Sequence, residues 1–295
     1  MILNASGCLD ALTAASVARS LDAFVTKTVT PLPRAGNPPT RIAETDAGML
    51  NSIGLANPGI DRFCVDVLPR LRELGVPIWV SVGGFAASDY ADLCARLDGE
   101  AGVAALELNV SCPNVSSPVD ATEEIVRAAR AATGKPLYTK LSPSAPDVAA
   151  AAEAAAQAGT DGLSVVNTLR GLALDERTLR PIVATGAGGY SGPALRPVAL
   201  AAAFACYRAT GLPIVGMGGV ETGRHALDLI AAGASAVALG TVLFRDPSAP
   251  GRIRAELAAE AASRGFAAPP DARGAAHEGK GASLPLLTKT PAKSQ

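Results

Sequence analysis

The chain has 295 residues, of which 48% are hydrophobic, and a formal net charge of −1, so it is long enough for one large core and gives no electrostatic reason to expect nucleic acid or an anionic membrane as partner. No apolar run reaches the roughly 18 residues of a membrane span, and no export signal is visible. The five cysteines include no C-x-x-C pair, so we expect a cytoplasmic protein without a metal site.

Short apolar runs alternate with alanine-rich helical patterns along most of the chain. The predicted strands are 2–5, 23–28, 78–82, 104–110, 136–141, 162–167, 214–217 and 236–239, and the predicted helices include 9–20, 61–74, 88–97, 121–133, 146–159, 197–210 and 222–233. Continuously apolar strands separated by helices indicate a parallel sheet covered by helices. The alternation predicts a single-domain (β/α)8 TIM barrel over residues 1–268, with an open doubly wound sheet as the alternative.

Three segments depart from this alternation. Residues 31–59 and 170–197 are rich in proline and glycine, and long loops of this kind usually serve as lids or binding walls. Residues 269–295 are polar and rich in proline, glycine and lysine. We expect this C-terminal tail to be disordered.

Polar residues stand where the predicted strands end. They are Asn4, Ser6, Lys27, Thr28, Ser81, Asn109, Cys112, Lys140, Asn167 and Thr168. A (β/α)8 barrel carries its active site at the carboxyl ends of its strands. A single lysine or asparagine there can be a snorkelling or capping group, but two lysines and several asparagines at equivalent places predict a ligand site.

Glycines follow the last two strands. Gly218 and Gly219 follow the seventh strand, and Gly240 with Thr241 follows the eighth. The loops at these positions are the usual phosphate site of this barrel, and the helix that begins near Thr222 is expected to add its positive end. A phosphorylated cofactor or substrate is therefore expected.

The residue types indicate a redox reaction. Lysines suit a ligand that carries or develops negative charge, and asparagine amides match the edge of a cyclic imide. A shielded cysteine such as Cys112 can remove a proton next to a carbonyl group. His225 and His277 are expected to be solvated, so the acid–base group lies elsewhere. Together these features predict dehydrogenation at adjacent carbons with a phosphate-anchored cofactor.

Several stretches are distinctive as a set: NASG (4–7), FVTKTVT (24–30), RAGNPPTRIAET (34–45), MLNSIGLANPG (49–59), LNVSCPN (108–114), KLSP (140–143), SVVNTLRG (164–171), GGYSGPALRP (188–197), GMGGVETG (216–223) and LGT (239–241). With them the chain resembles the class 1 dihydroorotate dehydrogenases over nearly its whole length. The resemblance implies a (β/α)8 flavoprotein that oxidises dihydroorotate to orotate in pyrimidine biosynthesis, with FMN as cofactor.

The resemblance also implies residue roles. Cys112 would be the base that takes the C5 proton while hydride passes from C6 to the flavin. The implied substrate-binding residues are Lys27, Asn51, Ser52, Ile53, Gly54, Leu55, Asn109, Asn114, Asn167 and Thr168. The implied FMN-binding residues are Ser6, Lys27, Thr28, Ser81, Asn109, Lys140, Val166, Gly192, Gly218, Gly219, Gly240 and Thr241.

Within the family, the stretches 43–59 and 167–182 resemble the NAD-linked class 1B catalytic subunit, which implies a homodimer that pairs with an FAD and iron–sulfur subunit in a heterotetramer. The alternatives are a fumarate-dependent class 1A homodimer, a flavin barrel acting on another dihydropyrimidine, and a non-catalytic barrel subunit. Departures from the family pattern include Ser81, which stands where the NAD-linked form generally has asparagine, and the segment after Cys112, which is shorter than the usual lid loop.

Overall fold

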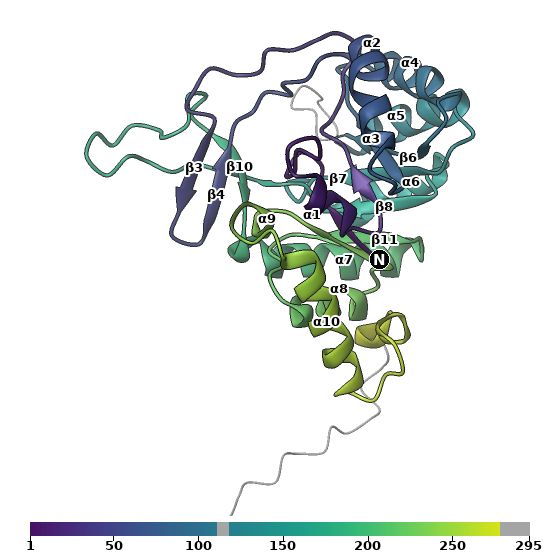
Figure 1. Ribbon diagram of the computed structural model, residues 1–295, viewed down its shortest axis with the longest axis vertical. Coiled ribbons are helices and arrows are strands. Elements are labelled where there is room, and N and C mark those ends of the chain that lie inside the picture. The colour runs from purple at the N-terminus through teal and green to yellow at the C-terminus, as the bar shows by residue number, and fades with distance from the viewer. Residues whose placement is uncertain (111–117, 278–295) are drawn as a thin grey trace, which may run out of the picture.

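Eight parallel strands form the centre of the computed structural model, which describes residues 1–110 and 118–277 (Figure 1). The strands are β1 (Ile2–Asn4), β2 (Phe24–Val25), β5 (Ile78–Val82), β6 (Val103–Asn109), β7 (Leu137–Leu141), β8 (Gly162–Val165), β11 (Ile214–Met217) and β12 (Ala236–Leu239). Their order is β1-β12-β11-β8-β7-β6-β5-β2, and a parallel bridge between Leu3 and Ala23 joins the first strand to the last. The predicted (β/α)8 barrel is confirmed.

The seam between β1 and β2 depends on a side chain. Because β2 has only two residues, the backbone ladder between the two strands is short. The Asn4 amide donates to the Val25 carbonyl at 2.7 Å and accepts from the Val25 N–H at 2.8 Å. Asn4, which we expected among the ligand-binding groups, is fully buried and holds the seam of the barrel.

Apolar side chains fill the part of the barrel interior that lies away from the carboxyl ends of the strands. They are Leu3, Ala23, Val25, Trp79, Ala105, Val215, Met217, Ala236 and Ala238. The rings of Trp79 and Tyr138 pack at a tilt of 39°, with centroids 4.5 Å apart. Since alternate residues of each strand point inward, the polar residues farther along the strands are left at the carboxyl-end mouth.

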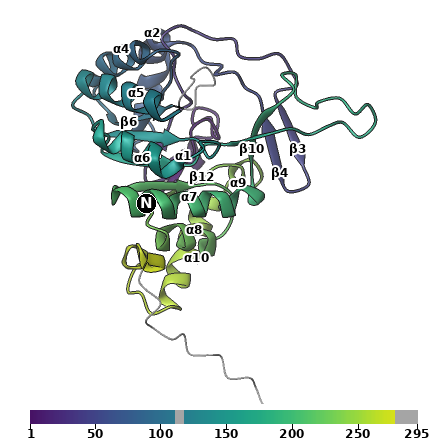
Figure 2. The ribbon, with the colours of Figure 1, turned by 180° about the vertical axis from the view of Figure 1, so that it is seen from behind.

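Helices cover the outside of the barrel (Figures 1 and 2). They are α1 (Ala15–Arg19), α2 (Ile60–Arg62), η1 (Phe63–Val67), α3 (Leu68–Arg72), α4 (Ala87–Asp98), α5 (Pro118–Ala132), α6 (Val148–Gln157), η2 (Pro193–Leu195), α7 (Arg196–Thr210), α8 (Gly223–Ala231), α9 (Val242–Arg245) and α10 (Ala249–Ala262). Their buried faces share one core with the outward faces of the strands. The predicted helix at 61–74 consists of two short α-helices around a π-helical turn.

A second sheet stands beside the barrel (Figures 1 and 2). Its antiparallel strands are β3 (Ile42–Thr45), β4 (Gly48–Asn51), β9 (Leu169–Gly171) and β10 (Gly188–Ser191), in the order β3-β4-β10-β9. The two segments that we expected to be loops therefore pair with each other. We call this sheet the arm.

The prediction of disorder is wrong for the first part of the C-terminal tail. Residues 269–277 are folded as two 3₁₀ turns, η3 (Pro269–Ala272) and η4 (Ala275–His277), of which η3 packs on α8 and α10. Ala272 is fully buried there. The other residues of the predicted tail, 278–295, lie outside the described part of the chain.

Candidate functional site

Polar side chains linked by hydrogen bonds cross the mouth of the barrel from β1 to β8. The Ser6 hydroxyl is 3.5 Å from that of Thr28, which is 3.1 Å from that of Ser81. The Asn109 amide donates to Thr28 Oγ1 at 3.2 Å and accepts from Asn167 Nδ2 at 3.0 Å. These predicted site residues therefore form one row, which we call the mouth row.

The backbone beneath the mouth row is held by further hydrogen bonds. The hydroxyl of the buried Tyr90 donates to the Asn109 carbonyl at 2.8 Å. Thr26 Oγ1 accepts from the Ser81 N–H at 3.1 Å, and the buried Val166 N–H donates to the Met217 carbonyl at 3.1 Å. Because these partners come from α4, from the residue that follows β2 and from β11, the row is pre-organised rather than flexible.

Lys27 and Lys140 both enter the mouth. Lys27 is half-buried, and its stem lies against Gly7, where a Cβ would come within 2.9 Å of Lys27 Cδ. Burial and the nearby charge of Lys140 lower the pKa of Lys27, while Cys8 raises it. The mouth is therefore a place where positive charge is concentrated and an anion would be stabilised.

Glu107 is a buried carboxylate that the sequence predictions omit. Its side chain is 1% exposed and lies 3.7 Å from the Lys140 ammonium, whose side chain is 6% exposed. Glu107 Oε1 and Ser164 Oγ form no hydrogen bond with the described residues. The signal was in the sequence: a charge within an apolar strand, two positions before Asn109 and hence on the same face.

The arm brings Asn51 to the mouth. The Asn51 amide donates to the Gly189 carbonyl of β10 at 3.1 Å. A Cβ on Gly189 would come within 2.1 Å of Thr168 Oγ1, so Asn51 and Thr168 border the same glycine. Ser52 is buried, and its hydroxyl is 2.5 Å from that of Thr185, inside the arm.

Ile53, Gly54 and Leu55 form a tight turn after β4. The Ile53 carbonyl accepts from the Asn37 N–H at 3.0 Å, and a Cβ on Gly54 would come within 2.4 Å of Asn37 Oδ1. Gly54 and Leu55 have φ values of +72° and +57°. A left-handed leucine is unusual, so tertiary contacts hold this turn in a strained shape.

The predicted phosphate loops depend on glycine. Gly192 and Gly219 adjoin, because a Cβ on Gly219 would lie 2.7 Å from the Gly192 carbonyl oxygen. Gly218, with φ of +130°, packs equally closely on Ala199. At Gly240 a Cβ would fit in ordinary contact, with Cys8 Sγ the nearest atom at 3.7 Å. Thr241 follows it at the start of α9.

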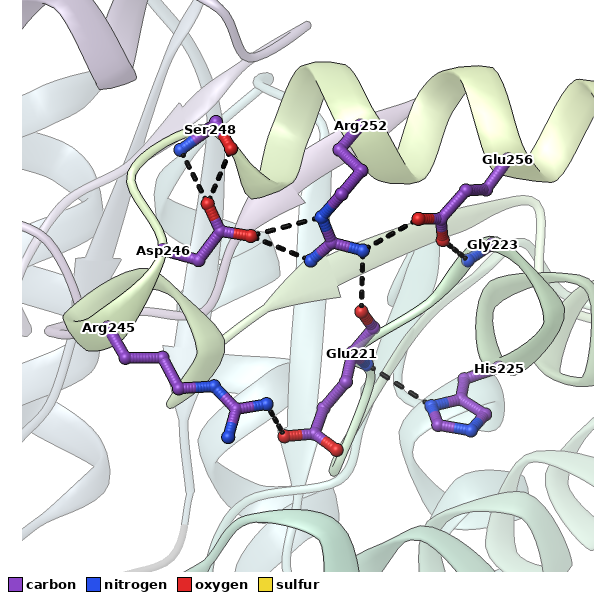
Figure 3. A network of polar contacts seen from close by, with 8 residues as sticks. All are labelled: Glu221, Gly223, His225, Arg245, Asp246, Ser248, Arg252 and Glu256. Carbon is purple, nitrogen blue, oxygen red and sulfur yellow. Dashed lines mark hydrogen bonds and ion pairs between the residues drawn. The ribbon is translucent and has the colours of Figure 1, made fainter.

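The first turn of α8 is already capped, which corrects one expectation. Glu256 Oε2 accepts from the Gly223 N–H at 2.7 Å (Figure 3), and Thr222 Oγ1 accepts from the His225 N–H at 3.3 Å. Since a carboxylate already lies at this end of the helix, α8 does not offer its positive end to a phosphate.

Both histidines are packed against other residues, in contrast to the expectation that they are solvated. His225 Nδ1 accepts from the Glu221 N–H at 3.3 Å. His277 stacks on Phe204 with ring centroids 3.9 Å apart. Neither contact involves the mouth row.

Cys112 and Asn114 lie outside the described residues, so the structure does not test their positions. In residues 1–110 and 118–277, no group of three His, Cys, Asp or Glu side chains could hold a metal ion. No helix in the same part of the chain is long and apolar enough to cross a membrane.

Comparison with known proteins decides the family. A family model described as dihydroorotate dehydrogenase matches residues 1–260. The chain belongs to the dihydroorotate dehydrogenase family. This membership confirms the resemblance and the prediction of an oxidoreductase that oxidises dihydroorotate in pyrimidine biosynthesis.

Individual members of the dihydroorotate dehydrogenase family match most of the chain. The chain is 46% identical over 264 residues to a Desulforudis audaxviator protein named dihydroorotate dehydrogenase B (NAD(+)), catalytic subunit, covering 87% of this chain and 86% of that protein. A Geobacter sp. (strain M21) protein of the same name is 46% identical, with 81% and 80% covered. The crystal structure of an Eimeria tenella dihydroorotate dehydrogenase in complex with ferulenol superposes with a TM-score of 0.79 at 25% identity, covering 94% of this chain and 85% of that one.

Proposed function

We propose that this chain is the catalytic subunit of an NAD-linked dihydroorotate dehydrogenase. The observation that carries the proposal is the mouth row, an amide- and hydroxyl-lined edge beside two lysines. Orotate and dihydroorotate combine an anionic carboxylate with ring amide and imide groups, and this site offers complementary charge and hydrogen bonds. The names of the two relatives above support the NAD-linked form.

The residues at the mouth fit FMN. The Lys140 ammonium is buried and lies 3.7 Å from Glu107 Oε1, an ion pair longer than a hydrogen bond, so it can still donate to a ligand. We propose that Lys27, Ser6, Thr28, Ser81, Asn109, Lys140 and Val166 contact the ring and ribityl chain, and that Gly192, Gly218, Gly219, Gly240 and Thr241 surround the phosphate. When bound, FMN supplies the acceptor for the hydride from substrate.

The substrate would lie between the mouth row and the arm. Lys27 would bind its carboxylate, and Asn109, Asn114, Asn167 and Thr168 its ring, under the wall formed by 51–55. Cys112 Sγ would remove the C5 proton. The pre-organised amides would hold the ring so that this proton faces the thiolate.

The electron acceptor would be NAD reached through a partner subunit. Within the described residues no metal-ligand cluster occurs, so iron–sulfur wiring would be supplied by the FAD and iron–sulfur partner. We propose a homodimer of this chain within a heterotetramer in the cytoplasm. A fumarate-dependent homodimer is the alternative for the acceptor.

The test is the visible spectrum of the purified chain supplied with FMN, followed anaerobically while dihydroorotate is added. The proposal expects a flavin band that bleaches on addition of dihydroorotate and recovers with NAD⁺ only when the partner subunit is present. A band that bleaches but recovers with fumarate alone would favour the alternative acceptor. A band that persists would contradict the substrate assignment.

A further inference from the structure

The loops after β11 and β12 are joined through α10 (Figure 3). The Arg252 guanidinium donates to Asp246 Oδ2 through Nε at 3.0 Å and through a terminal nitrogen at 2.7 Å. Its other terminal nitrogen donates to the Glu221 carbonyl at 3.1 Å and to Glu256 Oε1 at 2.8 Å. Glu221 follows β11, whereas Asp246 ends α9 after β12, so one side chain ties both loops together.

Two further contacts extend this connection. Glu256 uses its second oxygen to accept from the Gly223 N–H at 2.7 Å. Arg245, on α9, pairs with the Glu221 carboxylate. We call the set Glu221, Gly223, Arg245, Asp246, Arg252 and Glu256 the loop brace.

The brace rests on close packing as well as on charge. A Cβ on Gly223 would come within 2.2 Å of the Leu257 backbone nitrogen, so the first turn of α8 lies directly on α10. The Arg252 side chain is 37% exposed and Asp246 27% exposed. A single pair at such exposure stabilises little, but a forked arginine within a network has a defined geometry.

The brace sits just behind the glycines of the proposed phosphate site. Glu221 is two residues beyond Gly219, and Asp246 is five residues beyond Thr241. Arg252 itself is directed to Asp246, Glu256 and the Glu221 carbonyl, so it acts on the loops and not on a ligand. Because the brace fixes both loops to one helix, it fixes their spacing.

We propose that Arg252 is a positioning residue that sets the distance between the Gly218–Gly219 loop and the Gly240–Thr241 loop for a phosphate monoester. This inference rests on the proposed function, in which the monoester is that of FMN. Backbone N–H groups grip a phosphate only when they converge on it. Loss of the brace should therefore weaken the grip on the phosphate specifically.

The test compares the dissociation constants of FMN and riboflavin, which differ only in the phosphate. In Arg252→Met the preference for FMN over riboflavin should fall by about tenfold, a usual size for coupling between separate sites, while riboflavin affinity stays the same. Arg254→Met is the matched control: it lies on the same helix, is similarly exposed, and bonds to Asp22 and the Ser20 carbonyl instead. Its FMN preference should match that of the wild type.

An unchanged FMN preference in folded Arg252→Met would overturn the inference, even if the variant is less stable. If Arg252→Met does not fold, Glu256→Gln keeps the shape of the brace and removes one charge; its FMN preference should fall as well, and an unchanged preference would overturn the inference equally. A wild-type chain that binds both flavins equally would instead contradict the proposed cofactor site.

Discussion

At the scale of single residues, a buried carboxylate at the mouth compensates part of the charge of two lysines. Lys140 is close enough to Lys27 for its charge to lower the pKa of Lys27, and Glu107 lies 3.7 Å from the Lys140 ammonium. One buried carboxylate offsets part of the charge of two ammonium groups. The net positive charge that remains is suited to an anionic substrate.

The pKa of Lys27 leads to a prediction for orotate binding. Its pKa is lowered by burial and then by Lys140, so the ammonium is lost, and orotate affinity falls, at a lower pH than for an ordinary lysine. In Lys140→Met this alkaline fall should move to higher pH because one cause of the lowered pKa is removed. Calorimetric titration of the FMN-supplied protein with orotate, repeated across the alkaline pH range, measures the pH at which the affinity falls.

The control for this experiment is Lys135→Met, whose ammonium contacts backbone carbonyls of Glu100 and Val103 instead. It should keep the wild-type pH dependence. If orotate affinity falls at the same pH in Lys140→Met as in the wild type, the coupling between the two lysines is refuted.

Two cysteines can be compared directly as bases. Burial raises the pKa of Cys8 despite the opposing charges of Lys140 and Lys27, so Cys8 should stay a neutral thiol. We predict that Cys112→Ala retains FMN but loses about 10²–10⁴-fold in turnover, the usual contribution of a general base. Cys8→Ala should keep turnover close to wild type in stopped-flow reduction; the reverse pattern would exchange their roles.

At the scale of elements, the seam between β1 and β2 has little backbone pairing, because β2 has only two residues and a single bridge joins Leu3 to Ala23. The Asn4 side chain replaces backbone pairing there. The arm likewise joins segments far apart in sequence, since Asn51 of β4 pairs with Gly189 of β10. Both junctions lie next to the mouth, so the stability of these elements bears on the site.

Removing the Asn4 amide should destabilise the fold. Asn4→Ala leaves the Val25 N–H and carbonyl buried without these partners, at a cost of about 2–4 kcal/mol. Thr13→Ala, at an exposed hydroxyl that donates only to the Asp10 carbonyl, should change stability by no more than about 0.5 kcal/mol. Urea unfolding measures both, and equal midpoints for the two variants would disprove the role of the seam.

At the scale of the whole molecule, carboxylates with lowered pKa values set the response to acid. Hydrogen bonds from Ser248 and Arg252 lower the pKa of Asp246, and Arg252 with the Gly223 N–H lowers that of Glu256. A carboxyl group whose pKa is lower in the folded state stabilises above its unfolded pKa, and this stabilisation is lost as pH falls through the folded value.

The urea midpoint should therefore fall as pH drops below the ordinary carboxyl values of 3.8 for aspartate and 4.5 for glutamate. In Arg252→Met the decline should be shallower, because Asp246 and Glu256 lose the partner that lowers their pKa values. Arg254→Met should also make the decline shallower, but only through Asp22, because Arg254 helps to lower the pKa of that single carboxyl group. If the urea midpoint declines with pH equally steeply in the wild type and in Arg252→Met, Arg252 does not contribute to the acid response through these carboxyl groups.

Much of the barrel was predictable from local signals. The strands at 78–82, 214–217 and 236–239 have the predicted bounds, because each is a continuous apolar run flanked by turn residues. The predicted mouth residues Ser6, Thr28, Asn109 and Asn167 do meet, since parallel strands end at one face of a barrel.

The sequence by itself determined the barrel, its polar mouth and the family, because periodicity and strand ends are encoded in neighbouring residues. Only the tertiary structure decided the arm, the role of Asn4 in the seam, the Glu107 counter-charge and the loop brace. Each of these depends on partners distant in sequence, such as Asn51 with Gly189 or Glu221 with Arg252. A residue's pattern shows that it needs a partner, whereas chain packing determines which partner it meets.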